Sequence, residues 1–171
     1  MRQETIKIYT FEELSDEAKE NALSWYRGDG FEYHWSDEWR ESLQGFADYF
    51  ELSLTHWEVS TCGPYHFRFS CRNDDIENLQ GTRLWKYFKN NGFDPDDCQF
   101  TGYCGDESYL KPFREFMQKP DNRTFDDLMR DCLDAGFSDW QNDMEYQESD
   151  EYCIDHIIAN EYEFTENGKR Y

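Results

Sequence analysis

Acidic side chains recur at helix-like intervals in the last third of the chain. From Asp121 to Glu166, 46 residues include 15 Asp and Glu but only two basic residues, Arg123 and Arg130. Many of these acids are three or four positions apart, and on a helix that spacing places side chains on one face. Such a face presents a carboxylate about every 5 to 6 Å along the helix axis. The candidate partner-binding residues are Asp127, Asp131, Asp134, Asp139, Asp143, Glu145, Glu148, Glu151 and Asp155.

The chemistry open to a row of carboxylates is the binding of basic side chains. Phosphates follow one another on a similar scale, about 3.4 Å per strand along a duplex axis. We therefore expect the row to attract arginine and lysine residues that normally hold nucleic acid. The attraction should weaken with salt, because exposed charges are screened over roughly 8 to 10 Å. The alternative is an acidic surface that only contacts water, although closely spaced like charges destabilise a helix.

Other residue types that could do chemistry show no catalytic or metal-binding spacing. The four histidines are scattered, and the six cysteines form no CxxC pair. The acidic segments 74–77 and 94–97 do not match the twelve-residue calcium loop. No phosphate-binding glycine loop or GxSxG motif occurs. We expect a protein that is not an enzyme and needs no metal or cofactor, and a metal-dependent enzyme remains the third alternative.

A second candidate feature is a group of aromatic residues in the first quarter of the chain. These rings can form a core, which is the commoner explanation, or an exposed subset can anchor a protein partner. Base stacking is disfavoured, because stacking platforms lie in basic grooves. The group consists of Trp25, Tyr26, Phe31, Tyr33, Trp35 and Trp39.

The overall charge restricts the classes of partner. The 171 residues carry a formal net charge of -21, with 38 acidic and 17 basic side chains. Such a surface repels nucleic acid and anionic lipid and accelerates encounter with a basic protein. The sequence has no long apolar run and no signal-peptide pattern, so we expect a cytoplasmic protein with reduced cysteines and no membrane contact.

The aromatic content of 19% favours a folded chain with an aromatic core, in spite of the high charge. Hydrophobic periodicity predicts a single α+β domain over residues 1–171, with an antiparallel sheet of four or five strands packed by helices. Within residues 105–123, we expect a short helical pattern between Pro112 and Pro120, with Phe113, Phe116 and Met117, and a loop over the rest. We also expect Gly136 to interrupt the helix that Thr124 caps. Expected helices are 16–27, 36–50, 76–90, the segment from 124 and the segment from 149; expected strands are 5–9, 52–60, 65–71, 99–104 and 161–165, with a turn at 94–97.

Short polar residues mark several of the expected boundaries. Thr10 and Glu13 have the form of a capping box, and Ser15 and Ser149 are placed to cap helices. Alternating Tyr65, Phe67, Phe69 and Cys71 indicate that strands 52–60 and 65–71 form a hairpin.

Both ends of the chain resemble a family of small acidic proteins encoded by tailed phages and prophages. The similar segments are IKIYTFEELSDEAKENALSWYR (Ile6–Arg27) and IANEYEFTENGKRY (Ile158–Tyr171). The resemblance implies a phage gene expressed in a bacterial cytoplasm and assigns no active residues. In size, charge and compartment the chain is also similar to anti-CRISPR proteins and other phage inhibitors that mimic DNA.

These observations lead to one functional hypothesis and one main alternative. The hypothesis is a non-enzymatic, phage-encoded inhibitor whose acidic face occupies a basic nucleic-acid-binding cleft of a host defence protein, with CRISPR effectors as first candidates. The alternative is a phage accessory or structural protein whose charge serves solubility and whose aromatic residues mediate assembly.

Overall fold

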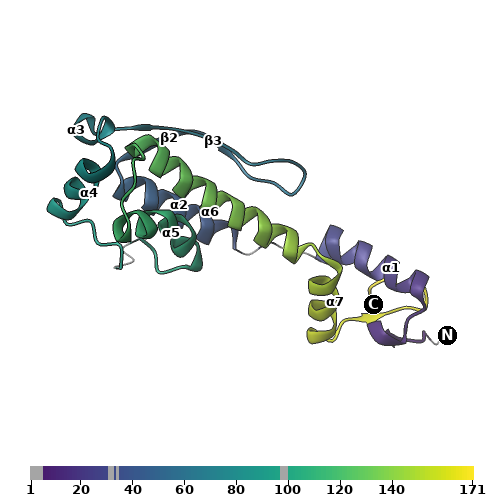
Figure 1. Ribbon diagram of the computed structural model, residues 1–171. Helices are drawn as coiled ribbons and strands as arrows, with labels where there is room; N and C mark the ends of the chain where they lie inside the picture. Colours follow the sequence, from purple (N-terminus) through teal and green to yellow (C-terminus); the bar gives the residue numbers. More distant parts are fainter. Residues whose placement is uncertain (1–5, 31–32, 34, 97–99) are drawn as a thin grey trace. The chain divides into compact units, whose positions relative to one another are not determined.

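The computed structural model describes residues 6–30, 33, 35–96 and 100–171. Contacts divide the chain into two compact units: unit 1 comprises Met1–Tyr33 and Met144–Tyr171, and unit 2 comprises His34–Asp143 (Figure 1). The single-domain organisation expected from the sequence stays a prediction. Thr5, Asp97 and Gln99, which the sequence assigns to strands and a turn, lie outside the described residues.

Unit 1 combines short helices with a small sheet built from the two ends of the chain. Strand β1 pairs antiparallel with β4, and Tyr9 lies opposite Phe164. The elements are β1 (Tyr9–Thr10), the 3₁₀ turn η1 (Phe11–Glu13), α1 (Asp16–Trp25), the π-helical turn η2 (Tyr26–Gly30), α7 (Asp150–Ala159) and β4 (Glu163–Phe164).

The helix starts of unit 1 follow from short polar side chains. Thr10 and Glu13 form the predicted capping box, in which the Thr10 backbone N–H donates to Glu13 Oε2 at 2.9 Å. Ser15 and Ser149 cap α1 and α7 as expected. The buried faces of these elements form one core: Phe11, Leu14, Ala18, Ala22, Leu23, Tyr26, Cys153, Ile157 and Phe164.

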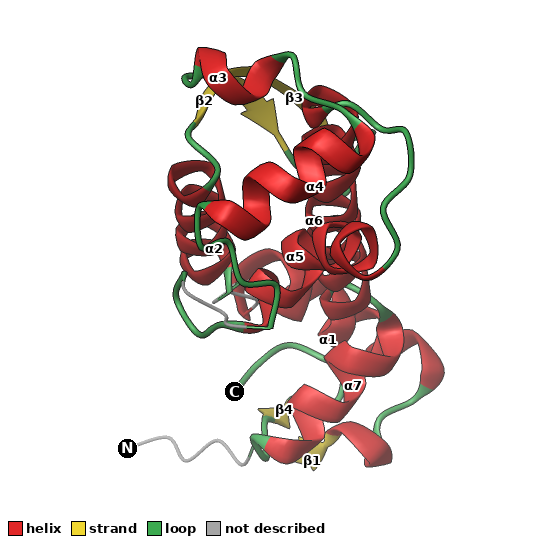
Figure 2. Cartoon of the chain, turned by 60° about the vertical axis from the view of Figure 1, so that its left-hand side comes forward, coloured by secondary structure: helices red, strands yellow, loops and turns green. Residues whose placement is uncertain are grey.

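Unit 2 is a helical bundle with one hairpin, and Figure 2 shows its helices as the dominant structure. The predicted hairpin is present: its two strands pair antiparallel, and Trp57 lies opposite Phe67. The elements are α2 (Ser36–Tyr49), β2 (Leu52–Glu58), β3 (His66–Cys71), α3 (Asp74–Glu77), α4 (Gly81–Asn90), α5 (Cys104–Gln118) and α6 (Phe125–Gln147), whose last four residues belong to unit 1.

Aromatic rings hold unit 2 together. The hairpin packs on α6, since the rings of Trp57 and Phe67 lie 6.0 and 5.4 Å from that of Phe137. Phe88 of α4 meets Phe113 of α5 at 5.0 Å in an edge-to-face contact, a favoured arrangement of buried rings. The expectation of an aromatic core is confirmed.

Mixed helix and sheet agrees with the predicted class, but the sheet differs. The four strands of the described residues form two separate two-stranded sheets, in place of one sheet of four or five strands. The first predicted strand is reduced to Tyr9–Thr10, and residues 100–103, expected in a strand, are irregular. Helices replace the missing strands as the main packing elements.

The predicted helix 76–90 is divided into α3 and α4. Gly81 has a φ of +56°, which glycine tolerates better than other residues. At the break, Leu79 accepts a backbone hydrogen bond from Phe125 at 3.1 Å. The helix is therefore interrupted where the backbone of Leu79 bonds the start of α6.

Two further predictions were wrong in the second half of unit 2. Residues 104–118 form the single helix α5, with Pro112 inside it, instead of a loop followed by a short helix after Pro112. Helix α6 continues through Gly136. A Cβ atom at position 136 would lie 1.9 Å from Tyr109 Cε1, so glycine here permits α5 and α6 to pack closely.

Candidate partner-binding site

The first three acids of the predicted row lie on one face of α6 and have local partners. Asp127 Oδ2 accepts hydrogen bonds from Thr124 N–H and Oγ1 at 3.2 and 2.7 Å. Asp131 accepts from Arg123 at 2.8 Å, and Asp134 interacts with the Tyr65 hydroxyl. The bonds from Thr124 hold the pKa of Asp127 below its usual value. These carboxylates serve helix capping and packing within unit 2.

Asp139 and Asp143 lie on another face of α6. At about 100° per residue, they are turned well away from the line through Asp127 and Asp131. Asp139 is exposed, while Asp143 is half-buried and accepts a hydrogen bond from the indole Nε1 of Trp39 at 3.4 Å. The row predicted from the sequence is therefore not one continuous stripe.

The remaining four acids belong to unit 1 and are arranged differently. Glu145, Glu148, Glu151 and Asp155 are exposed, and their side chains make no hydrogen bond or ion pair with the described residues. Glu151 and Asp155, one turn apart, share a face of α7 with Ile158, which is 42% exposed. We call Glu145, Glu148, Glu151, Asp155 and Ile158 the α7 surface.

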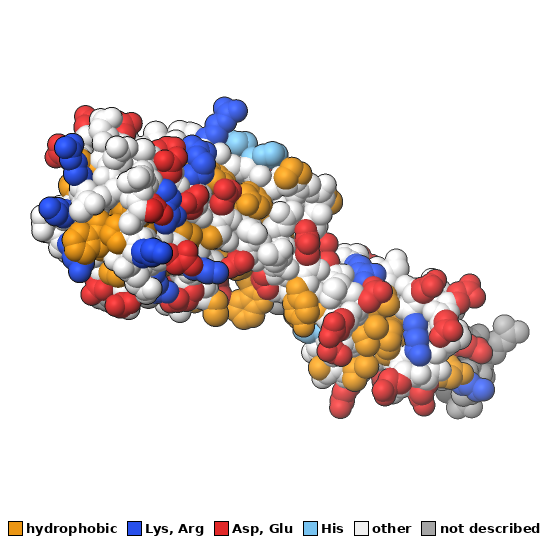
Figure 3. Space-filling model, in the orientation of Figure 1, with side chains coloured by type: hydrophobic (Ala, Val, Ile, Leu, Met, Phe, Trp, Pro, Cys, Tyr) orange, Lys and Arg blue, Asp and Glu red, His pale blue; other side chains and the backbone are white. Residues whose placement is uncertain are grey.

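Unit 1 as a whole is acidic, which adds to the negative charge of the α7 surface. Unit 1 contains 16 acidic and six basic residues within 61 positions. Of the described cations, Arg27 pairs with Asp150, and Arg170 lies over the ring of Tyr162 at 4.6 Å. Figure 3 shows acidic side chains around hydrophobic ones on the visible face of this unit. Unpaired carboxylates next to exposed apolar groups are the composition that a basic protein surface would match.

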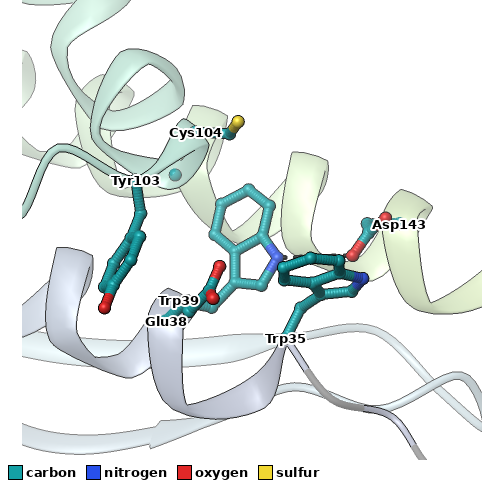
Figure 4. Close-up of a pocket in the computed structure, with 7 residues that line it drawn as sticks. Trp35, Glu38, Trp39, Tyr103, Cys104 and Asp143 are labelled. Atoms are coloured by element: carbon teal, nitrogen blue, oxygen red, sulfur yellow. Dashed lines mark hydrogen bonds between the residues drawn. The ribbon is translucent and has the colours of Figure 1, made fainter.

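Unit 2 contains a pocket of about 230 Å³. Figure 4 shows Tyr103 and Trp35 on opposite sides of the Trp39 indole, with the Glu38 carboxylate near Trp39 in this view. The walls come from α2, from the start of α5 and from α6. The residues that line it are Trp35, Glu38, Trp39, Tyr103, Cys104, Gly105 and Asp143.

The floor of the pocket is rigidly supported. Trp39 is 9% exposed and stacks on Trp140, with ring centres 5.9 Å apart and planes 6° apart. Behind Tyr103, the buried Asp106 carboxylate accepts hydrogen bonds from the backbone N–H groups of Thr101 and Gly102 at 2.9 and 2.8 Å. These contacts fix the loop that carries Tyr103.

The aromatic residues grouped in the first quarter of the chain include both buried and exposed side chains. Tyr26 and Trp39 are buried core residues, as expected, whereas Trp35 is 47% exposed. Phe31 lies outside the described residues. Tyr103 and Glu38, which complete the pocket with Trp35, were not predicted as site residues from the sequence. Only the contact between α2 and the start of α5 brings them together.

The described cysteines are free thiols: Cys62, Cys71, Cys104, Cys132 and Cys153. Burial raises the pKa of Cys132 and of Cys153, which disfavours their reactive thiolate form. Within the described ranges, no group of three or more His, Cys, Asp or Glu side chains is placed to hold a metal ion.

Comparisons with protein-family models, curated proteins and solved structures gave no match. The resemblance of the two chain ends to phage proteins therefore stays a prediction, as does the expectation that the protein is not an enzyme. Over the residues that the structure describes, every helix is too short or too polar to cross a bilayer.

Proposed function

We propose that this protein is a non-enzymatic inhibitor that binds a basic nucleic-acid-binding protein. The α7 surface would occupy the cleft in which the partner holds phosphates. One observation carries the proposal: the four carboxylates of this surface are exposed and unpaired among the described residues. Asp127 and Asp131, in contrast, already have local partners.

Unpaired carboxylates can form new charge-assisted hydrogen bonds with arginine and lysine without breaking existing ones. The binding energy of charge alone is sensitive to salt. Ile158 of α7 and Tyr146, whose ring contacts that of Tyr152 in α7 at 5.7 Å, are 42% and 54% exposed and add apolar area. Such side chains supply the part of the affinity that salt does not screen.

The proposed target follows from the resemblance of the chain ends to phage proteins. A phage protein that acts in the bacterial cytoplasm would meet host defence proteins there, and CRISPR effectors are the first candidates. The net charge of -21 disfavours direct binding to nucleic acid or to anionic membranes.

The test compares two triple variants with equal net charge. Glu148→Lys, Glu151→Lys and Asp155→Lys change the α7 surface; Glu41→Lys, Glu58→Lys and Glu115→Lys change exposed, unpaired acids of unit 2. Proteins retained from bacterial lysates by the wild-type chain are purified and loaded with labelled nucleic acid. The proposal expects the wild-type chain and the unit 2 variant to release the nucleic acid and the α7 variant to fail.

A phage accessory protein that assembles with copies of itself is the second candidate. The observation that favours it is the exposure of Ile6 and Ile8, which are 56% and 40% exposed beside the short β1–β4 sheet. Light scattering decides between the two. A defined multimer that displaces no nucleic acid from any retained protein would replace the inhibitor proposal by this one.

A further inference from the structure

The pocket of unit 2 combines aromatic walls with carboxylates, and none of its lining residues is basic. We propose that this pocket binds the guanidinium group of an arginine side chain. The inference deepens the proposed function and rests on it for the source of the ligand, which is the basic partner protein.

The aromatic residues offer faces for a cation. Trp35 and Tyr103 are 47% and 38% exposed, so part of each ring is open to a ligand. Trp39 is held in place by Trp140 and by Asp143. A cation over an indole face is attracted by the negative electron density of the ring, and tryptophan is the strongest of the aromatic side chains in this respect.

The carboxylates give the pocket its charge. Glu38 is half-buried, and its side chain makes no hydrogen bond or ion pair with the described residues. Its oxygens are therefore available to accept hydrogen bonds from a ligand. Asp143 accepts a hydrogen bond from Trp39 and adds negative charge to the same pocket.

Guanidinium fits this combination better than ammonium does. It is planar and weakly hydrated, stacks on aromatic rings, and presents paired N–H donors that match a carboxylate. A pocket of about 230 Å³ accommodates one such side chain. An anionic ligand would be repelled by the carboxylates of the pocket, and an apolar ligand would leave the Glu38 carboxylate without a partner.

The test uses a short peptide with one arginine, and its match with citrulline, which replaces the guanidinium by a neutral urea of the same shape. Each peptide is titrated into the full chain, and the indole N–H signal of Trp39 is followed by NMR. We expect a saturable shift with arginine, binding about tenfold weaker with lysine, and none with citrulline. Equal binding of citrulline or lysine would overturn the proposal.

Variants locate the binding site. Glu38→Gln and Trp35→Ala should each weaken arginine binding by about fivefold or more. Trp35 makes no side-chain capping bond at the start of α2, so its replacement removes no helix cap. Glu41→Gln, an exposed acid of α2 that does not line the pocket, is the matched control. Unchanged binding in both pocket variants would contradict the assignment.

Failure of the inference and failure of the proposed function give different results. Arginine binding in the pocket without displacement of nucleic acid from any partner contradicts only the inhibitor function. Displacement that Glu38→Gln and Trp35→Ala leave intact, with no arginine-peptide binding, contradicts only the arginine pocket.

Discussion

Trp39 of α2 donates a hydrogen bond from its indole to the carboxylate of Asp143 on α6, at 3.4 Å. The same ring stacks on Trp140 of α6. Asp143, which the sequence assigns to a phosphate-like row, is thus a wall of an aromatic pocket. The surroundings of Asp143 therefore depend on its contact with Trp39, which is 104 residues away in the chain.

The close contact of Gly136 with Tyr109 makes a strong stability prediction. Gly136→Ala would place Cβ 1.9 Å from the Tyr109 ring, and both residues are buried. We expect a loss of about 2 to 3 kcal/mol in the free energy of unfolding, more than alanine gains by helix propensity. Urea unfolding measures it.

Gly28→Ala is the control, because no atom lies within 4 Å of a Cβ at that position. It should be neutral or slightly stabilising. Equal stability of the Gly136→Ala variant and the wild type would contradict the packing of α5 on α6.

Among the residues that the structure describes, the hydroxyl of Tyr109 has no hydrogen-bond partner, although the side chain is fully buried. Burial raises the pKa of Tyr109, which keeps the phenol neutral. Tyr109→Phe should keep or raise the free energy of unfolding, by up to about 1 kcal/mol, because an unpaired buried polar group is costly. A clear loss in thermal or urea unfolding would reveal a partner for the hydroxyl.

The buried carboxylate of Asp106 positions the loop beside the pocket. Asp106→Ala removes the acceptor of the Thr101 and Gly102 N–H groups. We expect a loss of about 2 kcal/mol in the free energy of unfolding. Arginine-peptide binding should also weaken, since Tyr103 follows these residues directly. Undiminished binding in a destabilised variant would show that the pocket does not depend on the conformation of this loop.

The ion pair of Glu107 with Arg114 predicts a pH dependence. The hydrogen bond from Arg114 lowers the pKa of Glu107 from its usual 4.5. The pair therefore stabilises the fold above pH 4.5, and this contribution is lost as the pH falls through the lowered pKa. The Glu107 side chain is 62% exposed, so screening limits the effect to about 0.5 kcal/mol.

Urea unfolding of the wild type and Glu107→Gln checks this dependence. The two proteins should differ at pH 7 and converge below pH 4.5. A difference that grows on acidification has the wrong sign for the ion pair.

Much of the fold could be predicted from the sequence where local signals agree. Ser15, Ser149 and the Thr10–Glu13 capping box mark helix starts, and the alternation of Phe67, Phe69 and Cys71 marks the hairpin. Only the part of α5 after Pro112 was predicted, because proline normally disrupts a helix interior at a cost of about 3 kcal/mol. Burial of Tyr109, Leu110, Phe113, Phe116 and Met117 along one face outweighs that cost, and their spacing was the available signal.

The candidate site could be predicted only in part, since spacing does not reveal which carboxylates already have partners. Arg123 reaches Asp131 across eight residues, and Trp39 reaches Asp143 from a different helix. The side-chain carboxylates of Glu148, Glu151 and Asp155 accept no hydrogen bond within the described part of the chain, although Arg27 donates to the backbone carbonyl of Glu148 at 3.1 Å. Whether a carboxylate already has a partner depends on tertiary contacts, which the spacing of residues along the chain does not reveal.

The central claim is that this protein displaces nucleic acid from a basic partner through the α7 surface. The most direct measurement is a displacement assay with labelled nucleic acid on each retained partner, at low and at high salt. We predict release by the wild-type chain that weakens with salt and is lost with Glu148→Lys, Glu151→Lys and Asp155→Lys. Partners that keep their nucleic acid while bound, or equal release by this triple variant, would contradict the claim.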